Sequence, residues 1–199
     1  HLCFPGSFEF PYLQGTNASF RRSALLEVAG FDEEIEYYLD ETELCCRLVD
    51  AGYVIRQLSN AHVHHKFAPS HVRDEQRILR SRYPVFKNKI YFSLKHARRY
   101  LELANILEDG RDFIDRYRKD VESHIVAGRL PATERDRFED ESNRAWERGV
   151  ERGLSDRYEM INDEKLARDQ GSFVPFLPFA GSQRKSIVVV SGDFRPNLG

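Results

Sequence analysis

Carboxylates and imidazoles gather between residues 12 and 70, together with two glycine turns. Asp40, Glu41 and Glu43 fall where a helix is expected to begin, and a positioned carboxylate is a common general base. Three histidines follow within residues 62–65. Imidazole combined with carboxylates suits Mn²⁺ well and Mg²⁺ less well. These residue types therefore permit proton transfer and the binding of a divalent cation.

A purely structural interpretation accounts for part of the acidic cluster. Asp40, followed three positions later by Glu43, forms an Asp-x-x-Glu helix start, and the helix dipole favours acidic residues there. The two interpretations are compatible, because capping by Asp40 and Glu43 would fix the helix start and leave Glu41 projecting from it. Lone histidines are more often structural than ligands, and His62 and His64 are assigned to that structural class.

The elements expected to position these groups alternate between short strands and capped helices. Runs rich in β-forming residues lie at 10–13, 53–58 and 61–65. Helices are expected at residues 23–28 and 39–51, and Gly52 falls in the C′ position of the second helix. This half of the chain is therefore expected to be α/β.

The run from Tyr12 to Ser70 resembles the acceptor-side half of the family 2 glycosyltransferases, which are inverting enzymes of the GT-A fold. The resemblance implies a partial GT-A-like mixed sheet with helices. In that family the second acidic residue of the motif is the catalytic base, which assigns catalysis to Glu41 with Asp40 beside it. The family more often has Asp at the Glu41 position, and the longer side chain here carries the carboxylate farther from the backbone.

The resemblance also implies a substrate site. Gly15, Thr16 and Asn17 match a loop that lies under the donor sugar and the acceptor. Glycine allows close approach of the backbone to a ligand, and asparagine tolerates positive φ. Asp32, in a Gly-Phe-Asp-Glu turn, would face the acceptor or cap the turn. Glu43 is assigned to the substrate site as well.

The spacing of Ala61, Val63, His65 and Ser70 matches the histidine motif of the family. By that resemblance His65 contacts the metal or the donor diphosphate, and it should converge with Glu41 on one cleft. The other metal ligands of the family form an Asp-x-Asp motif on the donor side, and the sequence lacks this triplet. The expected cofactor is therefore a divalent cation, Mn²⁺ or Mg²⁺, with an incomplete site. Without the donor half, the chain alone is expected to be inactive.

Composition narrows the choice of partners. The 199 residues include 30 basic and 32 acidic side chains, and a net charge of -2 argues against a general nucleic-acid binder. The resemblance implies a nucleotide-sugar donor and a glycan or lipid-linked acceptor, as in synthesis of a surface polysaccharide. Basic and aromatic residues alternate at 73–99, which is either a solvated face or a peripheral contact with an anionic membrane.

Four segments are expected along the chain. They are a glycosyltransferase-like half at 1–70, a helical extension at 71–169, a linker at 170–184 and a lone C-terminal strand at 185–199. The last resembles the first strand of a family 4 glycosyltransferase. Because the chain begins at His1 rather than Met, it is expected to be a piece of a longer protein. Its three cysteines and the lack of an apolar run of about 20 residues indicate a cytoplasmic location, with contact at most to the inner face of a membrane.

The alternative from a different class is a non-catalytic interaction module, in which the helical extension binds a partner protein. Within the extension, apolar residues recur at helical spacing: Phe86, Ile90, Leu94, Ala97 and Leu101. This pattern predicts one buried face and one solvated face.

Overall fold

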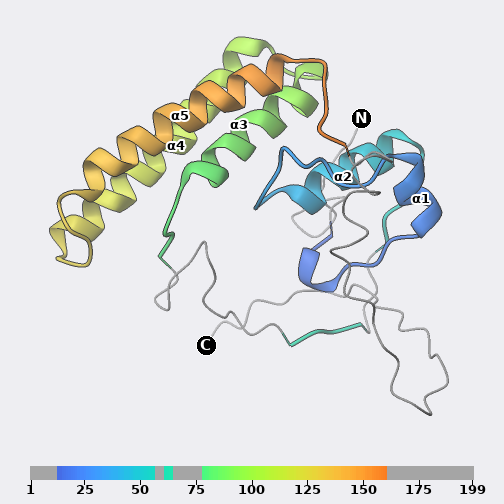
Figure 1. Ribbon diagram of the computed structural model, residues 1–199, viewed down its shortest axis with the longest axis horizontal. Helices are drawn as coiled ribbons and strands as arrows, with labels where there is room; N and C mark the ends of the chain where they lie inside the picture. Colours follow the sequence, from blue (N-terminus) through green and yellow to red (C-terminus); the bar gives the residue numbers. More distant parts are fainter. Residues whose placement is uncertain (1–12, 57–60, 65–77, 161–199) are drawn as a thin grey trace, which may run out of the picture. The chain divides into compact units, whose positions relative to one another are not determined.

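The computed structural model describes residues 13–56, 61–64 and 78–160 (Figure 1). The chain divides into two compact units. The first comprises His1–Glu33, Glu41–His65 and Glu159–Gly199, and the second comprises Glu34–Asp40 and Lys66–Tyr158. The described residues of each unit form a hydrophobic cluster of their own.

Among its described residues, the second unit has three long helices, α3 at Tyr83–His96, α4 at Leu103–Val126 and α5 at Glu134–Leu154. A short 3₁₀ helix, η2 at Ala97–Arg99, follows α3. The long helices pack against one another and lie side by side in Figure 1. None of the described helices is long and apolar enough to cross a membrane.

The core of this unit follows from helical spacing. Phe86, Ile90 and Leu94 lie one turn apart on α3, and all three are buried, as the sequence pattern predicts. They pack against buried side chains of α4 and α5: Ile106, Ile114, Val121, Phe138 and Ala145. The rings of Phe86 and Phe138 meet edge to face with centroids 5.5 Å apart. Leu101 was expected on the same face, but it lies beyond α3 and is 53% exposed.

Two glycines bring α5 close to α3. A Cβ atom at Gly149 would lie 2.9 Å from Cβ of Ile90, and one at Gly153 would lie 2.7 Å from Cβ of Leu94. Carbon atoms in favourable contact are about 3.5–4.0 Å apart. The two helices can therefore pack at this distance only because positions 149 and 153 carry no side chain.

Residues 34–40 are fastened to the helices of the second unit. The Glu34 side chain is 5% exposed. Its carboxylate faces three cations, Nζ of Lys87 at 3.4 Å, Nη2 of Arg148 at 3.0 Å and Nε of Arg152 at 2.9 Å. Nζ of Lys87 also donates to the backbone carbonyl of Glu34. This cluster is called the Glu34 network, and it compensates the cost of burying the carboxylate.

The 34–40 segment ends in a strained turn. Nδ2 of Asn88 donates to the carbonyl oxygens of Tyr37 at 2.5 Å and Tyr38 at 3.3 Å. Tyr38 and Leu39 have φ values of 71° and 72°, in the left-handed region that residues with side chains rarely adopt. Such strain persists only where the surroundings hold it, and the two hydrogen bonds from Asn88 supply part of that restraint.

The first unit contains η1 at Gly15–Asn17, α1 at Arg22–Glu27 and, apart from its first residue, α2 at Asp40–Asp50. Gly52 has a φ of 88°, which is the C′ conformation that the sequence predicts after α2. The buried cluster of this unit is small and consists of Ala24, Leu44 and Leu48.

Arg47 fastens α2 to the turn that follows α1. Its Nε and Nη2 atoms each lie 2.7 Å from a carboxylate oxygen of Glu43. The same guanidinium donates to the carbonyl oxygens of Val28 and Gly30. The Glu43 side chain is fully buried, and Arg47 is 12% exposed. A buried carboxylate is costly without a partner, so this ion pair is part of the unit's packing.

The described residues contain no strand, so the expectation of an α/β fold with a partial GT-A-like mixed sheet is wrong. The described part is 63% helical, and its β-type pairing includes an isolated antiparallel bridge between Asp32 and Met160. Residues 53–56 and 61–64 form no ladder, and Val54 is 81% exposed. β-forming residues produce a strand only where a neighbouring strand and a buried face are available. These runs have neither within the described residues.

Several expectations fall outside the described residues. They concern residues 10–12, 57–60 and 65–77, the linker at 170–184 and the strand at 185–199. The resemblance of the last segment to a family 4 glycosyltransferase therefore stays a prediction.

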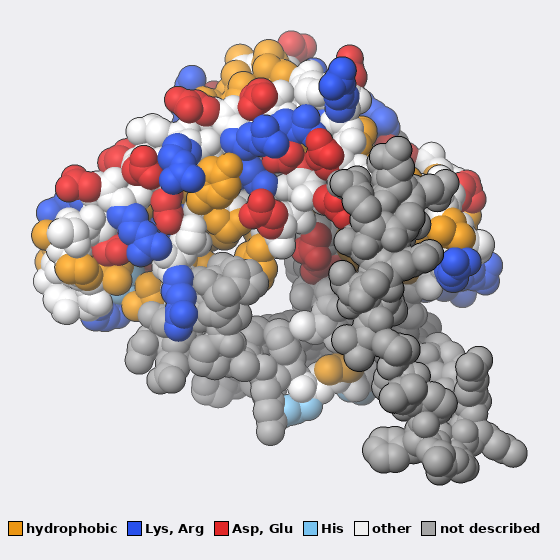
Figure 2. All heavy atoms as spheres, viewed as in Figure 1, with side chains coloured by type: hydrophobic (Ala, Val, Ile, Leu, Met, Phe, Trp, Pro, Cys, Tyr) orange, Lys and Arg blue, Asp and Glu red, His pale blue; other side chains and the backbone are white. Residues whose placement is uncertain are grey.

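Charged side chains of both signs are interspersed over the face of the molecule that Figure 2 displays. Some form exposed ion pairs between α4 and α5, such as Arg118 with Glu139 and Arg135 with Glu122. Exposed pairs of this kind contribute little to stability, so packing of the apolar faces carries most of the association between these helices.

Candidate functional site

The structure brings Glu41 to the Gly15 loop. The backbone N–H of Gly15 donates to Oε1 of Glu41 with an N···O distance of 3.0 Å, across 26 residues of sequence. A Cβ atom at position 15 would lie 3.4 Å from the same oxygen, so the glycine backbone passes directly beside the carboxylate. Glu41 is half-buried in the first turn of α2. A fixed carboxylate that solvent can still reach is suited to general-base catalysis.

Asn17 fastens the other end of the same loop. The residue is 8% exposed, and its Nδ2 donates to the carbonyl oxygen of Ala61 at 3.3 Å. Thr16, between the two anchored positions, is exposed. His62 and His64 follow Ala61 and are exposed as well. The loop is therefore held at both ends while its middle residue faces solvent.

Asp32 occupies a structural contact. The residue is 2% exposed, and its Oδ1 accepts a hydrogen bond from the backbone N–H of Glu159 at 3.1 Å. The N–H of Glu33 in turn donates to the carbonyl oxygen of Glu159 at 2.8 Å. The structure thus ties the Gly-Phe-Asp-Glu turn to a segment 127 residues away. Sequence reasoning had placed Asp32 at the acceptor or in a turn cap.

Asp40 and Glu43, the other two acidic residues of the motif, differ from Glu41 in position or burial. Asp40 is the first residue of α2 and is half-buried. Glu43, assigned from the sequence to the substrate site, is fully buried against Arg47. Sequence reasoning missed Arg47, although the spacing of four residues between Glu43 and Arg47 is a recognisable helical ion-pair pattern.

The expected metal contact, His65, lies outside the described residues. Its predicted convergence with Glu41 on one cleft therefore stays a prediction. In the part of the chain that the structure describes, no group of three or more His, Cys, Asp or Glu side chains could hold a metal ion.

The two cysteines of α2 have raised pKa values. Burial, together with a smaller contribution from the charge of Glu41, raises the pKa of the Cys45 thiol to about 11. Burial likewise raises the pKa of the Cys46 thiol to about 12, with an added contribution from Glu43. Both thiols therefore stay protonated at neutral pH, where the thiolate is the reactive form.

Two cations of the basic stretch at 73–99 point into the protein. Arg82 is 4% exposed and lies 3.2 Å from the Glu134 carboxylate. Lys87 is 3% exposed and belongs to the Glu34 network. These two side chains serve internal contacts and cannot contact an external anionic surface.

Comparisons of the chain with protein-family models, with curated proteins and with solved structures found no match.

Proposed function

We propose that Glu41 and the Gly15–Asn17 loop form the acceptor side of the active site of an inverting glycosyltransferase. The supporting observation is the 3.0 Å hydrogen bond from the N–H of Gly15 to the Glu41 carboxylate. It joins two of the motifs in which the sequence resembles the family 2 glycosyltransferases. Capping of a helix start would not by itself require Glu41 to be fixed against a distant loop.

In this reaction the acceptor hydroxyl oxygen attacks the anomeric carbon of a nucleotide sugar. Glu41 accepts the hydroxyl proton as the new carbon–oxygen bond forms. The bond between the anomeric carbon and the diphosphate oxygen breaks, and the nucleoside diphosphate leaves with the electron pair. The hydrogen bond from Gly15 orients the carboxylate before substrate binds, which reduces the reorganisation needed in the transition state.

The substrates follow from the resemblance. The donor would be a nucleotide sugar, and the acceptor would be a glycan or a lipid-linked sugar of a surface polysaccharide pathway. A divalent cation, Mn²⁺ or Mg²⁺, would neutralise the charge of the leaving diphosphate. The described residues do not supply three ligands for such a cation, and no step is assigned to it.

The test compares glycosyl transfer by the complete gene product that contains this chain, in wild-type, Glu41→Gln and Asp50→Asn forms. Release of nucleoside diphosphate is measured across a panel of nucleotide sugars, with oligosaccharide and lipid-diphosphate-sugar acceptors. Glu41→Gln should lower kcat by about 10²-fold or more and leave the donor KM nearly unchanged, because general-base catalysis contributes on that order. Asp50→Asn makes the same charge change at the exposed end of α2 and should retain turnover.

Near-normal turnover of Glu41→Gln would contradict the assignment of the base and make Asp40 the next candidate. If the wild-type protein transfers sugar from none of the donors, the non-catalytic interaction module becomes the better hypothesis. Far-UV circular dichroism of each variant shows whether its helices are intact.

A further inference from the structure

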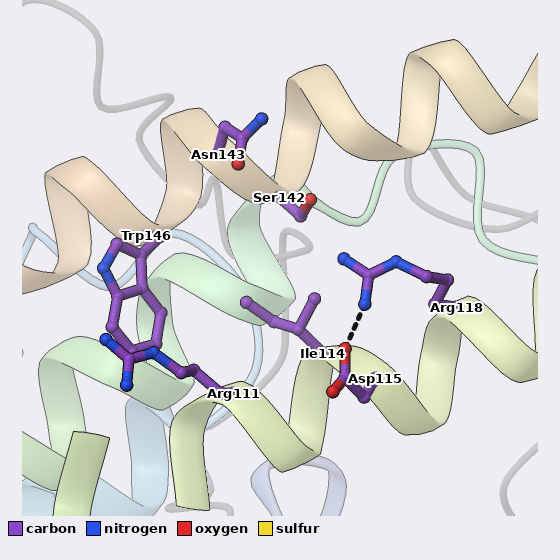
Figure 3. Close-up of a pocket in the computed structure, with 7 residues that line it drawn as sticks. All are labelled: Arg111, Ile114, Asp115, Arg118, Ser142, Asn143 and Trp146. Atoms are coloured by element: carbon purple, nitrogen blue, oxygen red, sulfur yellow. Dashed lines mark hydrogen bonds and ion pairs between the residues drawn. The ribbon is translucent and has the colours of Figure 1, made fainter. Parts of the chain in front are cut away.

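A cavity of about 340 Å³ lies between α4 and α5 of the second unit (Figure 3). Its lining combines a tryptophan, a buried aliphatic side chain, two arginines and shorter polar side chains, among them Arg111, Ile114, Asp115, Arg118, Ser142 and Trp146. Small-molecule sites in proteins have volumes of about 300 Å³ and above. The cavity belongs to a different unit from Glu41.

Arg111 contacts an aromatic ring and has no anionic partner among the described residues. In Figure 3, Trp146 extends from α5 toward α4, and Arg111 extends from α4 to meet its ring. The guanidinium carbon lies 5.1 Å from the ring centroid, which is a cation–π contact. No carboxylate among the described residues forms an ion pair with Arg111. The ring therefore fixes the guanidinium while its N–H groups can still receive an anion.

Arg118, farther along α4, is already paired. Its Nε lies 2.7 Å from Oε1 of Glu139, and its Nη1 pairs with Asp115. Arg111 and Arg118 carry two positive charges, and Asp115 and Glu139 carry two negative charges. The four side chains together therefore have no net charge. A single negative charge on a ligand can pair with Arg111, whereas a second charge would be repelled by Asp115 and Glu139. The groove therefore favours a monoanion over a di- or triphosphate.

Two side chains, Ile114 and Trp146, form the apolar part of the groove. Ile114 is 6% exposed and forms part of the floor, and the half-buried ring of Trp146 forms a wall. We propose that this groove binds small aromatic monocarboxylates, with the carboxylate on Arg111 and the ring between Ile114 and Trp146. The planar guanidinium matches a carboxylate through two parallel hydrogen bonds, and the apolar walls accept the ring.

The test uses the fluorescence of Trp146, which is the only tryptophan in the sequence. The 199-residue chain is titrated at constant ionic strength with benzoate and, separately, with its neutral counterpart benzamide. Benzoate should produce a saturable change in emission, and benzamide should not. Arg111→Met should weaken benzoate binding about tenfold or more, the loss expected for one charged hydrogen-bonded pair. Arg116→Met removes a cation from the same helix outside the cavity lining and should bind benzoate like the wild type.

Equal responses to benzoate and benzamide would overturn the proposal, as would a response that never saturates. Unchanged affinity of Arg111→Met would overturn it as well. If Arg111→Met loses its helical circular dichroism, Arg111→Lys decides instead. Lysine keeps the charge but not the paired hydrogen-bond geometry, so binding should be weakened to an intermediate degree, and wild-type affinity in this variant would contradict the proposed contact.

Discussion

Gly149 determines how closely α5 approaches α3. An added Cβ atom would lie 2.9 Å from Cβ of Ile90 and 3.0 Å from the carbonyl oxygen of Lys87. The second contact is with backbone, which cannot move without displacing α3. A methyl group at this position must therefore either separate the helices or compress the core, and both cost free energy.

We expect Gly149→Ala to lower the free energy of unfolding by about 1–2 kcal/mol. Overpacking costs about 1–3 kcal/mol, and the better helix propensity of alanine offsets up to about 1 kcal/mol. Gly110→Ala, on α4, is the matched control because its Cβ would lie 3.2 Å from the Trp146 ring, a side chain that can shift. Urea unfolding followed by circular dichroism should show little loss for the control, and equal losses would contradict the explanation by close approach.

At the scale of single residues, the catalytic role of Glu41 stays a prediction, whereas Asp32 and Glu43, assigned from the sequence to the substrate site, make internal contacts. The acidic motif and the glycine loop are local patterns, and the structure joins them through Gly15. The Asp32 carboxylate accepts its hydrogen bond from Glu159, 127 residues away. No local pattern encodes a contact of that range, so burial of Asp32 could not be predicted from its neighbours in sequence, whereas the partner of Glu43 lies only four residues away.

At the scale of elements, helices were predictable and strands were not. The signals for α2 and α3 are local, because helical spacing and a C′ glycine define the element within its own residues. A strand is stable only with a partner, which may come from anywhere in the chain. The β-forming run at 53–56 therefore gave a false prediction, since the described residues provide no neighbouring strand.

Removing Arg47 should loosen α2 from the turn after α1. Arg47→Met would leave Glu43 buried without its cation, and loss of one partner from a buried pair costs about 3–5 kcal/mol. The double variant with Glu43→Met should recover much of this loss, since no buried charge then remains. Thermal unfolding of the wild type, both single variants and the double variant forms a complete cycle. Additive losses would show that the two residues do not act as a pair.

At the scale of a whole folding unit, the Glu34 network joins the 34–40 segment to α3 and α5. Burial raises the pKa of the Glu34 carboxyl, but the hydrogen bond from Arg148 and the charges of Lys87 and Arg152 outweigh it and hold the pKa below its ordinary value of 4.5. Because the pKa of Glu34 is lower in the folded protein than in the unfolded chain, the carboxylate contributes its full stabilisation at pH values above the ordinary pKa. This stabilisation is lost as the pH falls through the lowered value.

We therefore expect the effect of Glu34→Gln to depend on pH. At pH 7 the variant should lose about 2–3 kcal/mol of unfolding free energy, because three cations lose their shared carboxylate. The difference from the wild type should shrink as the pH falls through the lowered pKa of Glu34, because the wild-type carboxyl then becomes protonated. Glu151→Gln, which removes an exposed partner of Arg148, is the control and should have a small effect. Urea unfolding at pH 7, 5 and 3 measures this, and a constant difference would contradict the explanation.

The Glu34 network also determines when the second unit can fold during translation, because its members are synthesised at different times. Glu34 and Arg148 are 114 residues apart, and a ribosome adding roughly 5–20 residues per second needs roughly 6–23 s to pass from one to the other. During that interval α3 has emerged without α5, so Phe86 and Ile90 lack their partners on that helix. The second unit can therefore close only after nearly all of it has been translated, and until then its apolar surface is open to aggregation.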